Sequence, residues 1–375
     1  MLPDRISPIT ITDIPIGPEL AIVVPTFNES GNVEELVARL CGALQGLAFE
    51  IIVVDDDSPD GTAEAVRRIG AGDMRVRCLQ RVGRRGLSGA VIEGMLASTA
   101  PVVAVIDGDL QHDETLLPQM YAELRRDDLD LVVASRYVSG GSVGDWSDAR
   151  HQGSKLATRL ARRLTGVTLH DPMSGFFMLR SDALRARARG LSGVGYKLLL
   201  DILATPGPAL SFRELPYRFQ ARQQGESKLD TKVLLEYIEL LLAKTVGRYV
   251  PVKFVMFSLV GALGLLVHMA VLGILFKKTG VGFSTAQTIA TLVAMTANFF
   301  VNNIFTYFDR RLRGWKLLPG WLSFCAASSV GALANVGVAV YLFQSFETVW
   351  YLSALAGVIV GATWNYAVTA LYTWK

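Results

Sequence analysis

Two carboxylates and an amide follow a strongly apolar run near the middle of the first half of the chain. Val102–Ile106 are five apolar residues, mostly β-branched, which is typical of a strand buried on both faces of a parallel sheet. Asp107, Asp109 and Gln111 follow at alternate positions, and alternate residues of an extended chain point the same way. Such oxygen ligands suit Mg²⁺ or Mn²⁺ bridging to nucleotide phosphates. The pattern predicts a metal and diphosphate site, and a solvated acidic turn is the alternative for Asp-x-Asp alone.

The segments around this run must position it. Apolar strand-like runs alternate with helical periodicity: strands at 20–25, 50–55, 75–79 and 129–135, and helices at 33–44, 62–69 and 89–97. Strands that alternate with helices indicate crossover connections and a mainly parallel sheet. The predicted fold class is therefore α/β and Rossmann-like, and in open sheets of this kind ligands bind beyond the carboxyl ends of the strands.

Two more polar clusters end strands of this sheet. Pro25–Glu29 follows the first strand and Asp55–Thr62 follows the second. Together with the carboxylates after Ile106, they predict one rim that takes a nucleotide and its metal. For Asp55 and Asp57 the alternative is turn chemistry before a helix that Ser58 or Asp60 caps.

Composition divides the chain into two parts. Of the 375 residues, the first 250 hold nearly all the charge, and the remainder is largely apolar. A net charge of +3 is too small to indicate a nucleic-acid partner. The three cysteines (Cys41, Cys78 and Cys325) have no paired or metal-ligand spacing, which fits a reducing cytosol.

A series of motifs now points to a family. In order they are VPTFNES, VVDDDSPDGTA, RVGRRGLSGAVIEG, DGDLQH, VASRYVSGG, DPMSGFFMLR and FQARQQGESKL. This order, from about Leu20 to Leu242, resembles the dolichyl- or polyprenyl-phosphate mannosyltransferases, which are inverting glycosyltransferases of the GT-A type. The SPDGT and GESKL segments favour the mannose branch over the related glucose branch.

The resemblance implies a role for each matching residue. Phe27 stands where a tyrosine is common and Gly108 where alanine is frequent. The nucleotide-sugar set is Pro25, Phe27, Glu29, Val54, Asp56, Asp107, Gly108, Asp109, Gln111, Arg136, Arg222 and Lys228. Within it, the implied metal ligands are Asp107, Asp109 and Gln111. A second implied set, Arg136, Arg150 and Ser154, holds the acceptor phosphate, and Arg136 belongs to both sets. Asp109, Arg136 and Arg150 are the implied catalytic residues.

Residue chemistry agrees with these roles. Arg150 and Ser154 lie four apart at the start of a predicted helix, and the arginine fork binds phosphate oxygens in pairs. Each basic residue alone could equally be a solvated surface charge. A lipid phosphate is already an anionic nucleophile, so no general base is needed. His112, His151 and His170 are therefore expected to be hydrogen-bonding loop residues.

Four long apolar segments follow: 252–276, 284–307, 317–343 and 349–374, each long enough to span a bilayer. Arg248 and Lys253 precede the first, and Arg310, Arg311, Arg313 and Lys316 lie between the second and third. The positive-inside rule then predicts both termini and the catalytic domain on the cytoplasmic face. Through Asn298–Thr306 the segments resemble a GtrA-like membrane domain. Val260–Leu263 recurs as Val330–Leu333, and Asn298 as Asn365, which suggests a duplicated helix hairpin.

The predicted organisation is a tail (1–19), a GT-A domain (20–230), an amphipathic interface helix (231–250) and a transmembrane domain (251–375). The alternative for the interface helix is a core-packing helix of the first domain. The implied reaction moves mannose from GDP-mannose to dolichyl or polyprenyl phosphate. A UDP-glucose glucosyltransferase, or a non-catalytic lipid-linked sugar transporter or scaffold, are the alternatives. The sequence leaves open the prenyl length, lipid flipping and whether a homo-oligomer forms.

Overall fold

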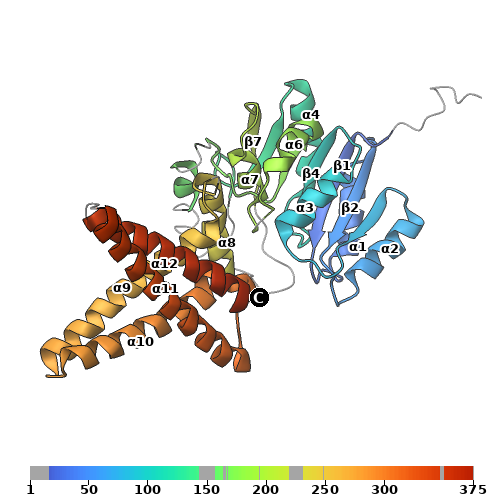
Figure 1. Ribbon diagram of the computed structural model, residues 1–375. Coiled ribbons are helices and arrows are strands. Elements are labelled where there is room, and N and C mark those ends of the chain that lie inside the picture. Colours follow the sequence, from blue (N-terminus) through green and yellow to red (C-terminus); the bar gives the residue numbers. More distant parts are fainter. Residues whose placement is uncertain are drawn as a thin grey trace, which may run out of the picture. The chain divides into compact units, whose positions relative to one another are not determined.

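The computed structural model describes residues 17–142, 157–163, 166, 168–193, 195–218, 231–247, 249–346 and 350–374. The chain divides into two compact units, Met1–Thr245 and Val246–Lys375. Figure 1 shows the sheet and its helices in the first unit and a bundle of long helices in the second.

A seven-stranded sheet forms the centre of the first unit, in the order β3-β2-β1-β4-β6-β5-β7. Its strands are β1 (Leu20–Thr26), β2 (Phe49–Asp55), β3 (Val76–Gln80), β4 (Val102–Val105), β5 (Leu131–Ser135), β6 (Phe177–Arg180) and β7 (Phe212–Pro216). Neighbours pair in parallel except around β6, which is antiparallel to β4 and β5. The predicted α/β fold with a mainly parallel sheet is confirmed.

Helices cover both faces of this sheet, which explains the nearly continuous apolar strands. On β1, Ile22 and Val24 belong to one core cluster, while Ala21 and Val23 belong to the other. The first cluster includes side chains of α1 (Val33–Ala43), α2 (Thr62–Gly72) and α4 (Leu117–Arg126). The second includes side chains of α3 (Leu87–Leu96), α6 (Ser181–Arg187) and α7 (Leu198–Ala204). The predicted strands and helices are present with ends shifted by a few residues, whereas α4, β6, α6, α7 and β7 were not predicted.

Strand register brings the functional loops to one edge. Pro25 lies opposite Val54, and Val23 lies opposite both Ile52 on β2 and Val105 on β4. Because the three strands run in parallel and end within a few residues of each other, the loops that follow them share the same rim.

Helix α8 (Thr231–Thr245) packs into the first unit. Its Tyr237, Leu240 and Leu241 are buried in the second core cluster, and Lys244 forms a buried ion pair with Asp201. Such contacts are those expected of a core-packing helix of the first domain, which was the alternative prediction to an interface helix. Association of α8 with a membrane surface stays a prediction.

The second unit contains the four expected long helices: α9 (Val252–Lys278), α10 (Phe283–Val301), α11 (Leu317–Phe346) and α12 (Trp350–Tyr372). All four are long and apolar enough to cross a membrane. α10 continues into a π-helical turn over Asn302–Thr306. α9 packs mainly on α10, and α11 mainly on α12.

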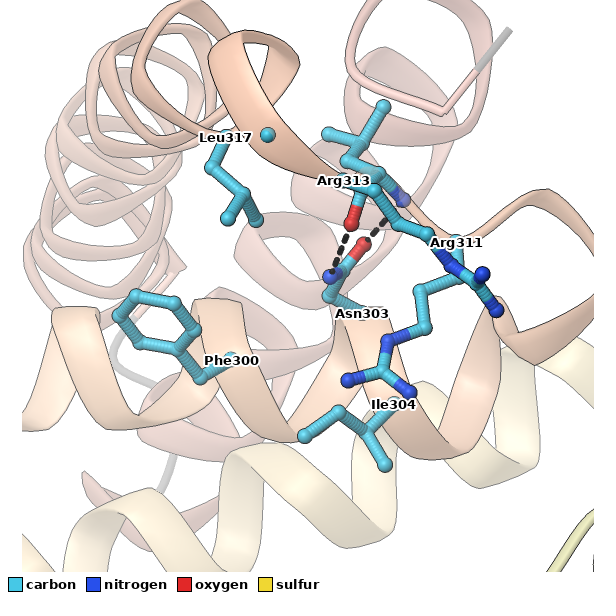
Figure 2. Close-up of a pocket in the computed structure, with 8 residues that line it drawn as sticks. Phe300, Asn303, Ile304, Arg311, Arg313 and Leu317 are labelled. Atoms are coloured by element: carbon cyan, nitrogen blue, oxygen red, sulfur yellow. Dashed lines mark hydrogen bonds between the residues drawn. The ribbon is translucent and has the colours of Figure 1, made fainter.

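Asn303 fixes the loop between α10 and α11 (Figure 2). Its Nδ2 donates to the Leu312 carbonyl at 3.1 Å, and its Oδ1 accepts the Leu312 N–H at 2.8 Å. The indole Nε1 of Trp374 donates to the same Oδ1 at 3.0 Å. Lys253, at the start of α9, pairs with Asp309 of this loop at 2.5 Å. The loop therefore has a defined shape at the end of the bundle where α9 begins.

Each helix pair of the second unit places an asparagine against a glycine. The Asn298 side chain occupies the space that a Cβ at Gly264 would need, and Asn365 does the same at Gly331. The partners are 34 residues apart in both pairs (298 − 264 and 365 − 331). This supports a duplicated hairpin with an offset of 67 residues (331 − 264). The Val260–Leu263 echo has an offset of 70 (330 − 260), so one duplication does not explain both echoes as we expected.

Candidate active site

The carboxylate pair lies directly beyond the end of β4. Ile106 donates its N–H to a β1 carbonyl at 3.2 Å, and Asp107 follows it at the sheet edge. Asp109 is 9 % exposed, and its Oδ1 accepts the N–H of Gln111 at 3.2 Å. Between them Leu110 has a left-handed φ of 59°. The chain therefore turns at Leu110. The prediction of an extended geometry, in which Asp109 and Gln111 point the same way, is wrong.

His112 holds the Asp107 carboxylate. Its Nε2 lies 3.0 Å from Asp107 Oδ2, and the imidazole is buried against two aromatic rings. Burial alone would raise the pKa of Asp107. The hydrogen bond and charge of His112, with the charges of Lys197 and Arg136, outweigh burial and lower that pKa below its usual value. Asp107 is therefore held as a carboxylate, the form that binds a cation.

Arg136 is buried against a fixed counter-ion. Its Nε and Nη2 donate to the two oxygens of Asp171 at 2.7 and 2.8 Å, and its backbone N–H donates to the same carboxylate at 3.2 Å. Burial would lower the pKa of the guanidinium, but the hydrogen bonds and charge of Asp171 raise it above its ordinary value. Two of the three guanidinium nitrogens point to Asp171, so this pair sets how Arg136 faces the site.

The segment after Asp171 also shapes the pocket of Asp107. A Cβ on Gly175 would lie 2.7 Å from Asp107 Oδ2, so only glycine leaves room for the carboxylate there. Ser174 donates from Oγ to the Ala134 carbonyl at 2.8 Å, which joins this segment to the end of β5. Asp107 and the partner of Arg136 are thus neighbours in space.

Hydrogen bonds join the loops after β1 and β2. The N–H of Asn28, which has a left-handed φ of 58°, donates to Ser58 Oγ at 3.0 Å, and the N–H of Glu29 donates to Thr62 Oγ1 at 3.1 Å. Asp60 Oδ1 accepts the N–H of Thr62, the first residue of α2, at 3.1 Å. The two loops therefore form one bonded surface at the rim.

Asp55 and Asp57 serve the turn, as the alternative interpretation predicted. Asp55 is fully buried and its Oδ2 accepts the N–H of Ser58 at 2.9 Å. Asp57 has a left-handed φ of 57°, and its Oδ2 accepts the N–H of Gly83 at 3.1 Å. Both carboxylates stabilise the loop that carries Asp56 between them.

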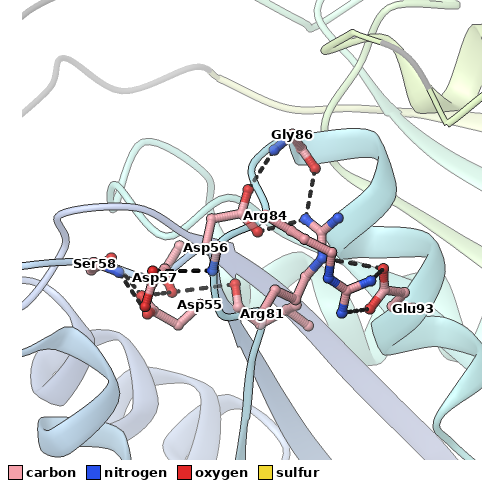
Figure 3. A network of polar contacts seen from close by, with 11 residues as sticks. Asp55, Asp56, Asp57, Ser58, Arg81, Arg84, Gly86 and Glu93 are labelled. Carbon is pink, nitrogen blue, oxygen red and sulfur yellow. Dashed lines mark hydrogen bonds and ion pairs between the residues drawn. The ribbon is translucent and has the colours of Figure 1, made fainter.

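Asp56 is buried in an ion pair with Arg81 (Figure 3). Its Oδ1 lies 2.5 Å from Arg81 Nη1, and its Oδ2 accepts the N–H of Gly86 at 2.6 Å. Glu93 accepts from Arg81 Nε at 3.2 Å and binds Arg84 through both oxygens. A carboxylate has about four acceptor positions, so Asp56 keeps acceptor capacity for a base or ribose donor. Its contact with the nucleotide stays a prediction.

Phe27, Val54 and Gly108 complete the described part of the nucleotide set. The Arg85 guanidinium lies 4.3 Å from the centre of the Phe27 ring, a cation–π contact. Val54 is fully buried in β2 between β1 and β3, and its contact with the nucleotide stays a prediction. A Cβ on Gly108 would lie 3.1 Å from Thr26 Cγ2, which shows how closely β1 and the carboxylate loop approach. Four other predicted residues lie outside the described residues: Arg150, Ser154, Arg222 and Lys228.

The donor set fits a divalent cation shared with phosphate. Among the described residues, no group of three or more His, Cys, Asp or Glu side chains is placed to hold a metal by itself. Asp107, Asp109 and the Gln111 amide offer oxygen ligands only, and Mg²⁺ commonly takes one or two carboxylates and completes its shell with phosphates and water. Predicted binding of Mg²⁺ or Mn²⁺ is therefore compatible with these side chains.

Comparison with known proteins decides the family. A dolichol-phosphate mannosyltransferase of Pyrococcus furiosus is 35 % identical over 361 residues, which cover 95 % of this chain and 99 % of that protein. The chain belongs to the dolichol-phosphate mannosyltransferase family. Residues 21–187 match the model of glycosyl transferase family 2, and residues 256–374 match that of the GtrA/DPMS transmembrane domain. The chain is thus a glycosyltransferase with a GT-A catalytic domain and an integral membrane domain.

Other relatives match a smaller share of the chain. The dolichol-phosphate mannosyltransferase of Saccharomyces cerevisiae is 33 % identical, over 60 % of this chain and 85 % of that protein. An undecaprenyl-phosphate mannosyltransferase of Micrococcus luteus is 31 % identical, over 58 % and 89 %. Glucosyl-3-phosphoglycerate synthase from Mycobacterium tuberculosis, solved with Mg²⁺ and UDP, aligns with a TM-score of 0.46 at 20 % identity, over 61 % of this chain and 80 % of that chain.

Three side chains at the site were missed as functional positions. Asp171 and Arg81 lie in motifs that we quoted for the resemblance (DPMSGFF and RVGRRGL), but spacing along the chain gives no sign of their partners. His112 was expected to be a hydrogen-bonding loop residue, and it does hydrogen-bond. Its role in holding Asp107 ionised was not predicted.

Proposed function

We propose that this protein transfers mannose from GDP-mannose to dolichyl or another polyprenyl phosphate, with inversion at the anomeric carbon. One observation carries the proposal: Asp107 and Asp109 share a sheet edge with the bonded loops of β1 and β2, in a chain that matches a dolichol-phosphate mannosyltransferase over nearly its full length.

The donor is proposed to lie across this edge. Phe27 and the carboxylate of Asp56 face the base and ribose, and the buried pair with Arg81 holds Asp56 in place. Outside the described residues, Arg222 and Lys228 are proposed to close over the diphosphate. Their cationic side chains would offset the charge that develops on the leaving nucleotide.

Asp107, Asp109 and Gln111 are the proposed ligands of Mg²⁺ or Mn²⁺. When bound, the ion would neutralise charge on the departing diphosphate. The chain contributes the ionised Asp107, which His112 orients, and the turn that places Asp109.

The acceptor phosphate is proposed to be held by Arg136, Arg150 and Ser154. Because this phosphate is already anionic, it attacks the anomeric carbon directly from the face opposite the nucleotide, which inverts the configuration. Asp171 fixes the guanidinium of Arg136, so that charge stays in position when substrates exchange.

We further propose that the catalytic unit faces the cytoplasm, since basic residues concentrate at the start of α9 and between α10 and α11. An accessibility test on single-cysteine variants at Ser142 and Thr279 in sealed membranes checks this orientation. Labelling of Ser142→Cys from the outside would contradict it.

A donor panel tests the reaction itself. Purified full-length protein is given a polyprenyl phosphate, Mg²⁺ or Mn²⁺, and either GDP-mannose or UDP-glucose, and the lipid-linked sugar is analysed for its identity and anomeric configuration. We expect β-linked mannosyl lipid from GDP-mannose. Faster transfer from UDP-glucose would favour the glucosyltransferase, and donor binding with no transfer would favour a transporter or scaffold.

A further inference from the structure

A pocket of about 340 Å³ lies in the membrane unit, where the chain turns from α10 into α11 (Figure 2). Its lining combines apolar side chains and arginines from one short stretch: Phe300, Asn303, Ile304, Arg311, Leu312, Arg313, Gly314 and Leu317. All of its lining residues belong to the second unit, whereas the carboxylate site is built from residues of the first.

Its two arginines have no counter-ion among the residues that the structure describes. Arg311 and Arg313 are exposed, and within the described part of the protein neither guanidinium takes part in an ion pair or a hydrogen bond. The nearby Asp309 is already engaged by Lys253 and lies 3.9 Å from Arg310. Two positive charges therefore line a pocket in which no described side chain neutralises them.

The pocket is built on a rigid frame. Asn303 is 2 % exposed, and its amide holds both backbone groups of Leu312, the residue between the two arginines. Trp374 donates to the same amide and stacks on Tyr307 with ring centres 4.1 Å apart. The two arginines are therefore anchored close together at one end of the bundle.

The walls suit a lipid. Phe300 and Ile304 expose 45 % and 42 % of their surface on a membrane-spanning helix, beside the cationic loop. α11 begins at Leu317 with no acidic residue in its first turn, so the positive end of its helix dipole adds to the arginines. Trp315, 89 % exposed, stands in the same loop, as is common for aromatic residues at the membrane interface.

We propose that this pocket binds an anionic membrane phospholipid, with its headgroup phosphate on Arg311 and Arg313 and an acyl chain along Phe300 and Ile304. Basic pockets between transmembrane helices recognise such headgroups, and the arginine fork matches phosphate oxygens. None of its lining residues belongs to the proposed acceptor phosphate set of Arg136, Arg150 and Ser154. Lipid binding at this pocket does not require the proposed transferase activity, and it is not ruled out if that activity is absent.

The test is lipid binding by purified full-length protein in detergent, measured by native mass spectrometry with phosphatidylglycerol and phosphatidylcholine. The variant is Arg311→Gln/Arg313→Gln. Its matched control, Lys277→Gln/Lys278→Gln, loses the same charge at the other end of α9. We expect the first to weaken phosphatidylglycerol binding about 10-fold or more, since charge-assisted hydrogen bonds to phosphate are lost. The control variant should bind phosphatidylglycerol as the unmodified chain does. Binding of phosphatidylcholine should be the same in all variants.

A second variant, Arg311→Lys/Arg313→Lys, keeps both charges and therefore the membrane orientation. It should bind phosphatidylglycerol more weakly than the unmodified chain and more tightly than the glutamine variant, because lysine lacks the fork. Equal losses in the Lys277/Lys278 control would overturn the proposal. Two further measurements use inorganic phosphate and polyprenyl phosphate as probes. Displacement of bound phosphatidylglycerol by inorganic phosphate as effectively as by lipid would also overturn the proposal. So would a glutamine variant that loses binding of polyprenyl phosphate only.

Discussion

The arginines of the two units are neutralised in different ways. In the catalytic unit, Arg81 and Arg136 are buried, and each is paired with a buried aspartate at hydrogen-bond distance. In the membrane unit, Arg311 and Arg313 are exposed in a loop whose described contacts give them no partner.

The two environments place different demands on an arginine. A buried arginine loses its hydration and needs a fixed counter-ion from the chain, because an isolated buried charge costs several kcal/mol. An arginine at a bilayer surface keeps access to water and to lipid phosphates. The buried arginines are thus part of a preformed site, whereas the exposed arginines are available to a ligand from outside the chain.

The largest effect is expected where a buried pair is broken. Asp171→Asn should lower turnover by about 10²-fold or more and destabilise the catalytic unit by about 3–5 kcal/mol, because Arg136 then stays buried without its counter-ion. Initial rates and thermal unfolding measure the two effects. Asp128→Asn, which breaks the exposed pair with Arg180, is the matched control and should change neither. Similar behaviour of the two variants would contradict the comparison.

A second change separates carboxylates that serve a ligand from those that neutralise an arginine. Asp109→Asn should lower turnover by about 10²-fold through loss of a charged ligand for the divalent ion, while the melting temperature stays close to that of the unmodified chain. Rates measured against Mn²⁺ concentration give the readout. Near-normal turnover, or full activity in excess chelator, would rule out the metal assignment.

A smaller effect concerns pH. His112 lowers the pKa of Asp107, so His112→Ala should raise that pKa, because burial then acts with less opposition. The carboxylate then takes up its proton at a higher pH, and the acidic limb of the pH–rate profile moves upward. His170→Ala removes an exposed histidine that pairs with Glu214 and serves as the control. An unmoved acidic limb in His112→Ala would contradict the assignment.

The smallest effect is expected at a membrane-side pair. Lys253 and Asp309 are both partly exposed, so Asp309→Asn should change stability by less than about 1 kcal/mol and leave turnover unchanged. Thermal unfolding in detergent measures it. A loss as large as that of Asp171→Asn would mean that this end of the bundle also depends on fixed pairs.

The sequence predicts the sheet and the rim well, because long β-branched runs and the residues after them report local structure. It predicted that the loops after β1, β2 and β4 meet, and register confirms this. β6 was missed because Phe177–Arg180 is only four residues long and continues a loop-like motif. Its antiparallel position between β4 and β5 is not visible in local pattern.

Partners across long separations could not be predicted. Asp171 is 35 residues from Arg136, and Arg81 is 25 residues from Asp56, so only the folded chain reveals these pairs. The amphipathic pattern of α8 fits a membrane surface as well as a protein core. Its Lys244 pairs with Asp201 inside the first unit, and that contact depends on tertiary structure, so the pattern alone could not predict it.

The asparagine–glycine pairs of the membrane unit bear on how the chain enters the bilayer. Asn298 meets Gly264, and Asn365 meets Gly331, each within one hairpin. During synthesis, the polar amide of each second helix therefore finds its packing partner in the helix inserted just before it. The glycine of the same hairpin provides this contact, so it does not depend on the other hairpin. This contact can therefore form as each hairpin inserts, before the bonds between the hairpins, such as that of Trp374 to Asn303, are made.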